Sequence, residues 1–192
     1  MSKTTRVLIV GVGHMGYSHA LAYQNIDDCE IVGLVARNIE HNEKAITQFP
    51  GVQTFNCFED ALSQTSPDIV VISSYPDTHA EYAMAALECG AHVFVEKPLA
   101  VTLADCARIV AAARVSGRQV MVGHGARFSK IFVALHKLVQ DGTLGEACFV
   151  EGDYVHDLGP FLDLPGHDWW LDAEQEGQLS IIGGACHPLD LM

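Results

Sequence analysis

The residues that could carry chemistry begin with a Glu-Lys-Pro triplet at the end of an apolar run. Residues 93–95, Val-Phe-Val, favour a buried strand, and Glu96, Lys97 and Pro98 follow them directly. Proline has no backbone N–H and restricts the preceding residue to extended conformations, so Lys97 is expected on a stiff backbone where the strand ends. Glu96 and Lys97 are therefore candidates for a functional site, and the alternative is an ordinary solvated strand end.

A glycine turn near the N-terminus supplies a second candidate site. Residues 6–10 form a short apolar run, and a G-x-G-x-x-G pattern that opens a helical pattern comes directly after it. Gly11 would permit the tight turn, Gly13 would let the backbone approach a pyrophosphate, and Gly16 would let the helix lie close to the strand. The pattern predicts a dinucleotide site whose contacts are Gly11, Gly13, His14, Met15 and Gly16. The alternative is a plain tight turn between a strand and a helix.

The end of the second predicted strand indicates which dinucleotide binds. An NAD site usually offers an acidic residue to the ribose hydroxyls there, whereas residues 36–38 are Ala-Arg-Asn. Arg37 could meet a 2′-phosphate and stack on adenine, so the sequence favours NADP over NAD as the cofactor. In the alternative interpretation, Arg37 points into solvent.

A third loop, residues 73–79, comes at the end of the continuous apolar strand predicted at 68–73. Loops at the carboxyl ends of parallel strands bind ligands in sheets of this kind, so Ser73, Tyr75 and His79 are expected near the cofactor. A helix N-terminus disfavours imidazolium, which makes a neutral, structural His79 the preferred interpretation over a catalytic one.

Composition limits the classes of partner. The 192 residues are 49% hydrophobic and 18% charged with a mean hydropathy of +0.18, which indicates a well-packed globular protein. With 24 acidic and 11 basic residues, the net charge of −13 opposes binding to nucleic acid or to an anionic membrane. The six cysteines form no Cys-x-x-Cys pair and the first residues lack the apolar run of a signal peptide, so a cytoplasmic protein with reduced thiols is expected.

These loops need a scaffold that gathers strand ends at one edge. Strand-like runs at 6–10, 30–35, 52–55, 68–73, 91–95 and 119–122 alternate with helical patterns. This order predicts an α/β fold, with a doubly wound parallel sheet in a dinucleotide-binding domain at residues 1–123. Residues 124–192 differ: we expect a helix with one apolar face from Phe128 to Val139, a strand at 146–155 with interleaved polar residues, and an irregular stretch reaching Trp169 and Trp170.

Together these segments resemble the Gfo/Idh/MocA oxidoreductases, NAD(P)-dependent enzymes that act mainly on sugars, polyols and their derivatives. The resemblance spans essentially the whole chain and rests on residues 11–16, 73–79, 96–98, 123–128 and 184–190. It implies a Rossmann domain followed by the first part of a second α/β domain, whose open, mostly antiparallel sheet serves substrate binding and oligomerisation. It further implies a small sugar-like substrate, and a homo-oligomer if that sheet is completed.

The resemblance also implies roles for individual side chains. Lys97 would lie between nicotinamide and substrate, and His187 matches the family's usual proton-transfer histidine. Oxidation at an alcohol carbon requires loss of the hydroxyl proton, a task suited to an imidazole. Arg127 and Asp190 are the further substrate residues expected, and Asp190 shares a helix face with His187.

The chain departs from the family at one catalytic position. Many members carry an Asp four residues before the histidine, and here that residue is Gly183. A carboxylate that relays a proton or orients substrate is absent there, so a non-catalytic dinucleotide-binding module stays open as an alternative. The resemblance leaves a further alternative open, an NAD-dependent glycosidase of the same family. No metal site is expected, because His156, Asp157, His167 and Asp168 lack a tight ligand spacing.

Overall fold

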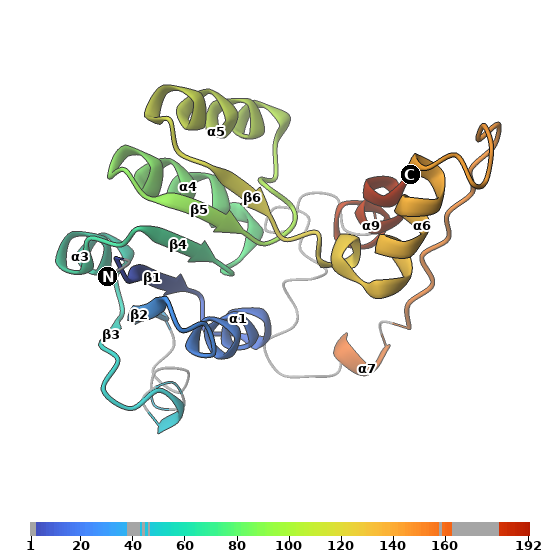
Figure 1. Ribbon diagram of the computed structural model, residues 1–192. Coiled ribbons are helices and arrows are strands. Elements are labelled where there is room, and N and C mark those ends of the chain that lie inside the picture. Colours follow the sequence, from blue (N-terminus) through green and yellow to red (C-terminus); the bar gives the residue numbers. More distant parts are fainter. Residues whose placement is uncertain (1–2, 38–42, 44, 46, 158, 163–180) are drawn as a thin grey trace. The chain divides into compact units, whose positions relative to one another are not determined.

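The computed structural model describes residues 3–37, 43, 45, 47–157, 159–162 and 181–192 (Figure 1). The chain divides into two compact units, Met1–Val122 and Gly123–Met192. All strands among the described residues belong to the first unit, and short helices joined by irregular chain make up the second. In the part of the chain that is described, no helix is long and apolar enough to cross a membrane.

The first unit alternates strands and helices. Its elements are β1 (Thr5–Val10), α1 (His14–Gln24), β2 (Cys29–Val35), β3 (Thr54–Phe55), α3 (Phe58–Thr65), β4 (Ile69–Ile72), the 3-10 turn η1 (Pro76–Thr78), α4 (His79–Glu88), β5 (His92–Val95), α5 (Leu103–Ser116) and β6 (Val120–Val122). Local chemistry fixes several ends. The hydroxyl of Thr102 caps α5 by accepting from the Asp105 N–H at 3.1 Å, and Gly117 ends the helix with φ +66°.

The sheet has the strand order β3-β2-β1-β4-β5-β6, and all its pairs are parallel. The order reverses between β1 and β4, which creates a switch point where sheets of this class bind ligands. The predicted doubly wound parallel sheet is confirmed.

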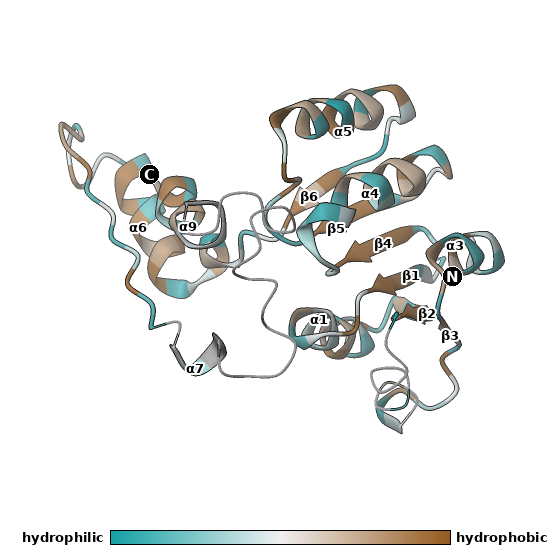
Figure 2. Cartoon of the chain, turned by 180° about the vertical axis from the view of Figure 1, so that it is seen from behind, coloured by the Kyte–Doolittle hydropathy of each residue, from teal (hydrophilic) through white to brown (hydrophobic). Residues whose placement is uncertain are grey.

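Helices cover both faces of this sheet, and the strands between them are mostly hydrophobic (Figures 1 and 2). Alternate residues of β1 point to opposite faces: Val7 and Ile9 join a cluster with Ala20 of α1, while Leu8 and Val10 join a cluster with α3, α4 and α5. These four of the six β1 residues are at most 2% exposed. Because such strands are buried on both faces, they appear in the sequence as continuous apolar runs without alternating polar residues.

The second unit consists of η2 (Gly125–Phe128), α6 (Lys130–Gln140), α7 (Gly159–Leu162), the π-helical turn η4 (Ile181–Ala185) and α9 (Cys186–Leu191). The hydroxyl of Ser129 caps α6 by accepting from the Phe132 N–H. The expected apolar stripe is present on α6, but most of its large side chains, including Ile131 and Leu138, are exposed.

The strand expected at residues 146–155 is not a strand in the structure, where this segment has no regular secondary structure. Alternating polarity gives a segment a face to bury, but a strand also needs a neighbouring strand to bond its N–H and C=O groups. No described segment of the second unit offers such a ladder. The irregular stretch expected to reach Trp169 and Trp170 lies largely outside the described residues, and both tryptophans are among those not described.

Candidate functional site

Three loops of the first unit emerge from neighbouring strand ends. In the parallel ladders Val10 pairs with Ile72, and Ile72 pairs with Val95. Hydrogen bonds extend this row by one residue: the Ser73 N–H donates to the Val10 carbonyl at 2.7 Å, and the Glu96 N–H donates to the Ile72 carbonyl at 2.8 Å. The glycine turn, the loop after β4 and the Glu-Lys-Pro segment therefore meet at the carboxyl edge of the sheet, beside its switch point.

The glycine turn is held by contacts that only glycine permits. Gly11 has φ +84°, and a Cβ added there would lie 2.5 Å from the carbonyl oxygen of Ser73. A Cβ on Gly16 would lie 1.7 Å from the Gly11 carbonyl oxygen, so α1 can approach β1 only with glycine at this position. Gly13 is different, because a Cβ there would meet nothing within 4 Å. The turn therefore requires glycine at Gly11 and Gly16 for structural reasons, whereas Gly13 borders open space.

This open space lies at the start of α1. Gly13 is the N-cap and provides no side-chain hydrogen bond, so the first N–H groups of the helix need another acceptor. Across the turn, Ser73 carries a buried hydroxyl oxygen that has no hydrogen-bond partner. Backbone donors at a helix N-terminus together with a buried unpaired hydroxyl fit a pyrophosphate group. His14 and Met15 occupy the first turn of the same helix and are both exposed.

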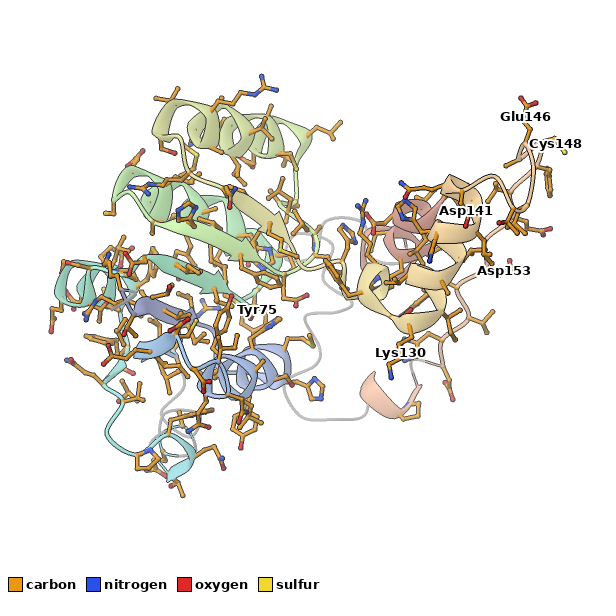
Figure 3. The ribbon with its side chains drawn as sticks, in the orientation of Figure 1. Tyr75, Lys130, Asp141, Glu146, Cys148 and Asp153 are labelled. Atoms are coloured by element: carbon orange, nitrogen blue, oxygen red, sulfur yellow. The ribbon has the colours of Figure 1, made fainter. Side chains whose placement is uncertain are left out.

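Arg37 and Tyr75 come together from separate loops. The Arg37 guanidinium carbon lies 5.1 Å from the centroid of the Tyr75 ring, within cation–π range. Arg37 follows β2, and Tyr75 lies in the loop after β4 (Figure 3). The pair places a positively charged group on an aromatic ring near the end of β2.

His79 joins the loop after β4 to the Glu-Lys-Pro segment. It is 1% exposed, with Nδ1 at 2.8 Å from the Pro98 carbonyl oxygen and Nε2 at 3.1 Å from that of Ser74. A neutral ring has one N–H, which we assign to Nδ1 because its contact is shorter. Burial lowers the pKa of His79 and outweighs the two carbonyl contacts, which act in the opposite direction. The buried ring therefore holds the backbone of Ser74 and Pro98 in position.

Glu96 has a partner that the sequence did not reveal. Its Oε1 lies 2.8 Å from Nε2 of His19 on α1, and its Oε2 accepts from the Lys97 N–H at 3.3 Å. His19 also meets Phe94 edge-on, with ring centroids 4.8 Å apart. Glu96, 8% exposed, thus ties the backbone of Lys97 to α1. The available signal was the position of His19, one helical turn after Gly16 on the face of α1 that lies against the sheet.

In the second unit the predicted site residues lie close together. Nε and an Nη of Arg127 donate to the two carboxylate oxygens of Asp190 at 2.6 and 2.7 Å, a bidentate pair. Arg127 is the main cause that lowers the pKa of Asp190, with smaller contributions from His124 and His187. His124 Nδ1 lies 3.8 Å from Asp190. Arg127, predicted to contact substrate, is therefore engaged by a carboxylate of its own unit.

His187 lies on α9 beside an aromatic ring. Tyr154 stacks on it with centroids 5.5 Å apart, and His124 approaches edge-on at 6.3 Å. A Cβ added to Gly184 would lie 3.0 Å from the Tyr154 ring, so glycine permits this approach. Tyr154 and His124 were not predicted, because nothing in their sequence neighbourhood indicates a contact with α9. Lys97 and His187, the two predicted catalytic residues, belong to different units.

Comparison with known proteins agrees with this geometry. Residues 5–124 match the model of an oxidoreductase family with an NAD-binding Rossmann fold, GFO_IDH_MocA. Over 156 residues the chain is 31% identical to inositol 2-dehydrogenase of Salmonella typhimurium, covering 80% of this chain and 46% of that protein. Over 165 residues it is 30% identical to alpha-N-acetylgalactosaminidase of Shewanella oneidensis, covering 81% of this chain and 36% of that protein.

A solved structure matches over nearly the whole chain. The NAD-binding protein from Listeria innocua superposes with a TM-score of 0.78 at 26% identity, covering 98% of this chain and 54% of that one. The chain thus spans less than half the length of both curated relatives named above. The strand order, the glycine turn and the match over residues 5–124 lead to one conclusion: the chain belongs to the Gfo/Idh/MocA oxidoreductase family and carries its NAD-binding Rossmann fold.

Proposed function

We propose that this protein is an NAD(P)-dependent oxidoreductase that transfers a hydride between the nicotinamide and a sugar, a polyol or a related carbonyl or alcohol. The observation that carries the proposal is the carboxyl edge of the sheet. There the glycine turn, the unpaired hydroxyl of Ser73 and the segment of Glu96 and Lys97 follow three adjacent strands at the switch point. When bound, the cofactor accepts or supplies the hydride.

Two side chains have proposed catalytic roles. Lys97 stabilises negative charge on the substrate oxygen as the carbonyl and alcohol forms interconvert. His187 takes the hydroxyl proton during oxidation and returns it during reduction. His19 and Glu96 act as positioning residues, because their 2.8 Å contact fixes the backbone that carries Lys97. With Gly183 in place of an acidic residue, His187 works without a carboxylate at that position.

The cofactor is proposed to be NADP in preference to NAD. Support comes from Arg37, whose guanidinium lies over Tyr75 at the end of β2, where no acidic residue competes for ribose hydroxyls. Arg37→Gln should weaken NADP binding at least about tenfold relative to NAD, measured as the ratio of the two dissociation constants. Arg108→Gln, on the outer helix α5, is the matched control and should leave the ratio unchanged. An unchanged ratio in Arg37→Gln would contradict the preference.

The remaining parts of the proposal concern the whole protein. The second unit contributes to a substrate and oligomerisation domain with an open, mostly antiparallel sheet, and the full protein is a homo-oligomer. A cytoplasmic location is supported by the six cysteines, all of which are free thiols. The family and the two named relatives support a small sugar-like substrate.

A second candidate function is the cleavage of a glycosidic bond with transient use of the same cofactor. It is favoured by one observation, the 30% identity to the galactosaminidase, which nearly equals the identity to the dehydrogenase. The two functions differ in outcome. A dehydrogenase accumulates reduced cofactor with an oxidised sugar, whereas a glycosidase of this kind releases a sugar with no net reduction.

The deciding experiment is an absorbance assay of cofactor reduction across a panel of polyols, sugars and glycosides, with product analysis. Lys97→Met and His187→Asn should each lower kcat at least about 100-fold while the variants still bind cofactor. The matched controls are Lys130→Met and His136→Asn on α6, which should behave as the parent. Cofactor binding with neither reduction nor sugar release would favour a non-catalytic dinucleotide-binding module, and full activity of Lys97→Met would overturn the proposed mechanism.

A further inference from the structure

The second unit gathers three side chains that are ligands for soft divalent cations. His124 lies just before η2, and Cys186 and His187 are the first residues of α9. One potential ligand atom of each lies within 4.8 Å of the others, and all three residues are half-buried. In a tetrahedral zinc site with metal–ligand bonds of about 2.0–2.3 Å, neighbouring ligand atoms lie about 3.5 Å apart. Shifts of about 1 Å would therefore close the set around one ion.

A second observation points to a ligand at the same place. Nδ1 of His124 is buried and has no hydrogen-bond partner. The nearest carboxylate oxygen, Oδ2 of Asp190, is 3.8 Å away, which is beyond hydrogen-bond range. A buried ring nitrogen without a partner costs free energy unless a ligand or a slight closure satisfies it. A metal ion could satisfy Nδ1 in two ways. It could bind Nδ1 directly, or it could bind Nε2 while the Nδ1–H group moves closer to the Asp190 carboxylate and donates to it.

The surroundings are those of a metal site with an outer shell. Asp190 is held in place by its bidentate pair with Arg127, so its carboxylate faces His124 in a fixed orientation. A histidine ligand that donates its other N–H to a carboxylate is the usual arrangement in zinc sites. The Tyr154 ring, stacked on His187, limits the orientations of that imidazole.

We propose that His124, Cys186 and His187 form a binding site for Zn²⁺ or a cation of similar softness, with Asp190 orienting His124. Two imidazoles and a thiolate leave a fourth position for water. Binding releases the thiol proton of Cys186 to solvent and forms one sulfur–metal and two nitrogen–metal bonds. Sequence spacing gave no indication of this set, because His124 and the Cys-His pair lie far apart along the chain.

The consequence concerns His187. A metal on its imidazole occupies the lone pair that would accept the substrate proton, so zinc is a reversible inhibitor of hydride transfer. This consequence rests on the proposed function, whereas the binding site itself does not.

The test is titration of the full chain with Zn²⁺ by calorimetry and with Co²⁺ by absorption spectroscopy. We expect about one ion per chain and a thiolate-to-cobalt charge-transfer band. Cys186→Ser should remove this band, and His124→Gln should weaken binding about 10- to 100-fold. The controls are Cys148→Ser, whose thiol lies on the loop beyond α6 (Figure 3), and His136→Gln, both exposed in the same unit. Circular dichroism establishes that each variant is folded.

Three outcomes would overturn the site: cobalt binding without the band, unchanged affinity in folded Cys186→Ser, or an equal loss in the controls. The inhibition is measured as the ratio of rates with and without Zn²⁺ within each variant, with recovery on chelation. Metal binding by a protein that reduces no cofactor would refute the proposed function and leave the site standing. An active enzyme with no such metal binding would refute the site and leave the function standing.

Discussion

The two candidate regions of this molecule are built in opposite ways. At the cofactor edge of the first unit, backbone hydrogen bonds between strands position the loops after β4 and β5, and the ends of β1 and β4 beneath them are buried. In the second unit, side-chain contacts hold the candidate residues: the Arg127–Asp190 pair and the Tyr154–His187 stack. None of the residues in α6 or α9 is buried.

This difference indicates how each region will respond to change. A site carried by a packed sheet is most sensitive to changes that push its backbones apart, because interiors are close-packed and have no room for added atoms. A site held by a few partly exposed contacts responds mainly to the loss of those contacts and leaves the rest of the chain unaffected.

The largest expected effect comes from adding one methyl group beneath the cofactor edge. Gly16→Ala places a Cβ 1.7 Å from the Gly11 carbonyl oxygen, so α1 must move away from β1. We expect a loss of about 3 kcal/mol or more in the free energy of unfolding, together with loss of cofactor binding. Denaturant unfolding and calorimetry measure the two effects.

Gly13→Ala is the matched control for this change. Its Cβ would meet no atom of the protein within 4 Å, so the fold should remain intact while the new methyl group hinders a bound pyrophosphate. Stability within about 1 kcal/mol of the parent, with cofactor affinity lowered at least about tenfold, is the expected result. Equal destabilisation by the two alanines would contradict the assignment of separate roles to these glycines.

The next effect concerns the His19–Glu96 pair, which supports the cofactor edge. His19→Ala leaves the carboxylate of Glu96 without its 2.8 Å partner in a site where both side chains are mostly buried. We expect a loss of about 1–3 kcal/mol, and a smaller loss for His19→Gln, which keeps a donor. His14→Ala, an exposed change on the same helix, should cost less than about 0.5 kcal/mol. Equal melting temperatures for the His19 and His14 variants would exclude a supporting role for the pair.

The cofactor edge was predictable because its information is local. Apolar runs give the strands, and glycines directly after the first run give the turn. The order of strands and helices then gives the doubly wound sheet, which brings the ends of β1, β4 and β5 together. The expected elements of this unit therefore lie within a few residues of the observed ones.

Contacts between side chains far apart in the sequence could not be predicted in this way. His19 and Glu96 are 77 positions apart, and Arg127 and Asp190 are 63 apart. The position of His19 on α1 indicates that its side chain faces the sheet, but no local pattern in either pair identifies the partner residue. The prediction of a strand at 146–155 was wrong for a related reason. Alternating polarity is a property of the segment, whereas pairing depends on a neighbour that the segment does not specify.

A smaller, local effect is expected in the second unit. Asp190→Asn keeps the shape of the side chain but weakens the bidentate pair with Arg127. Amide hydrogen exchange in α9 should accelerate by less than about tenfold, because the pair is partly exposed, while the strands of the first unit keep their protection. Asp153→Asn, an exposed change on the neighbouring irregular segment (Figure 3), serves as control. Faster exchange throughout the sheet would show that the two units do not respond separately.

The smallest expected effect is a loss of stability of the first unit at acidic pH, which is absent at neutral pH. Burial lowers the pKa of His79 in the folded protein below its unfolded value of about 6.5, so between these values the unfolded chain binds more protons. The His79 contribution to stability is therefore fully present above about pH 6.5 and is lost as the pH falls through the folded pKa. Unfolding measured from about pH 5 to about pH 8 should show this decline in the parent and in His136→Gln, and a flatter profile in His79→Gln. Because His79 bridges the carbonyls of Ser74 and Pro98, an unchanged profile in His79→Gln would mean that the buried ring is not the group that links acid to the cofactor edge.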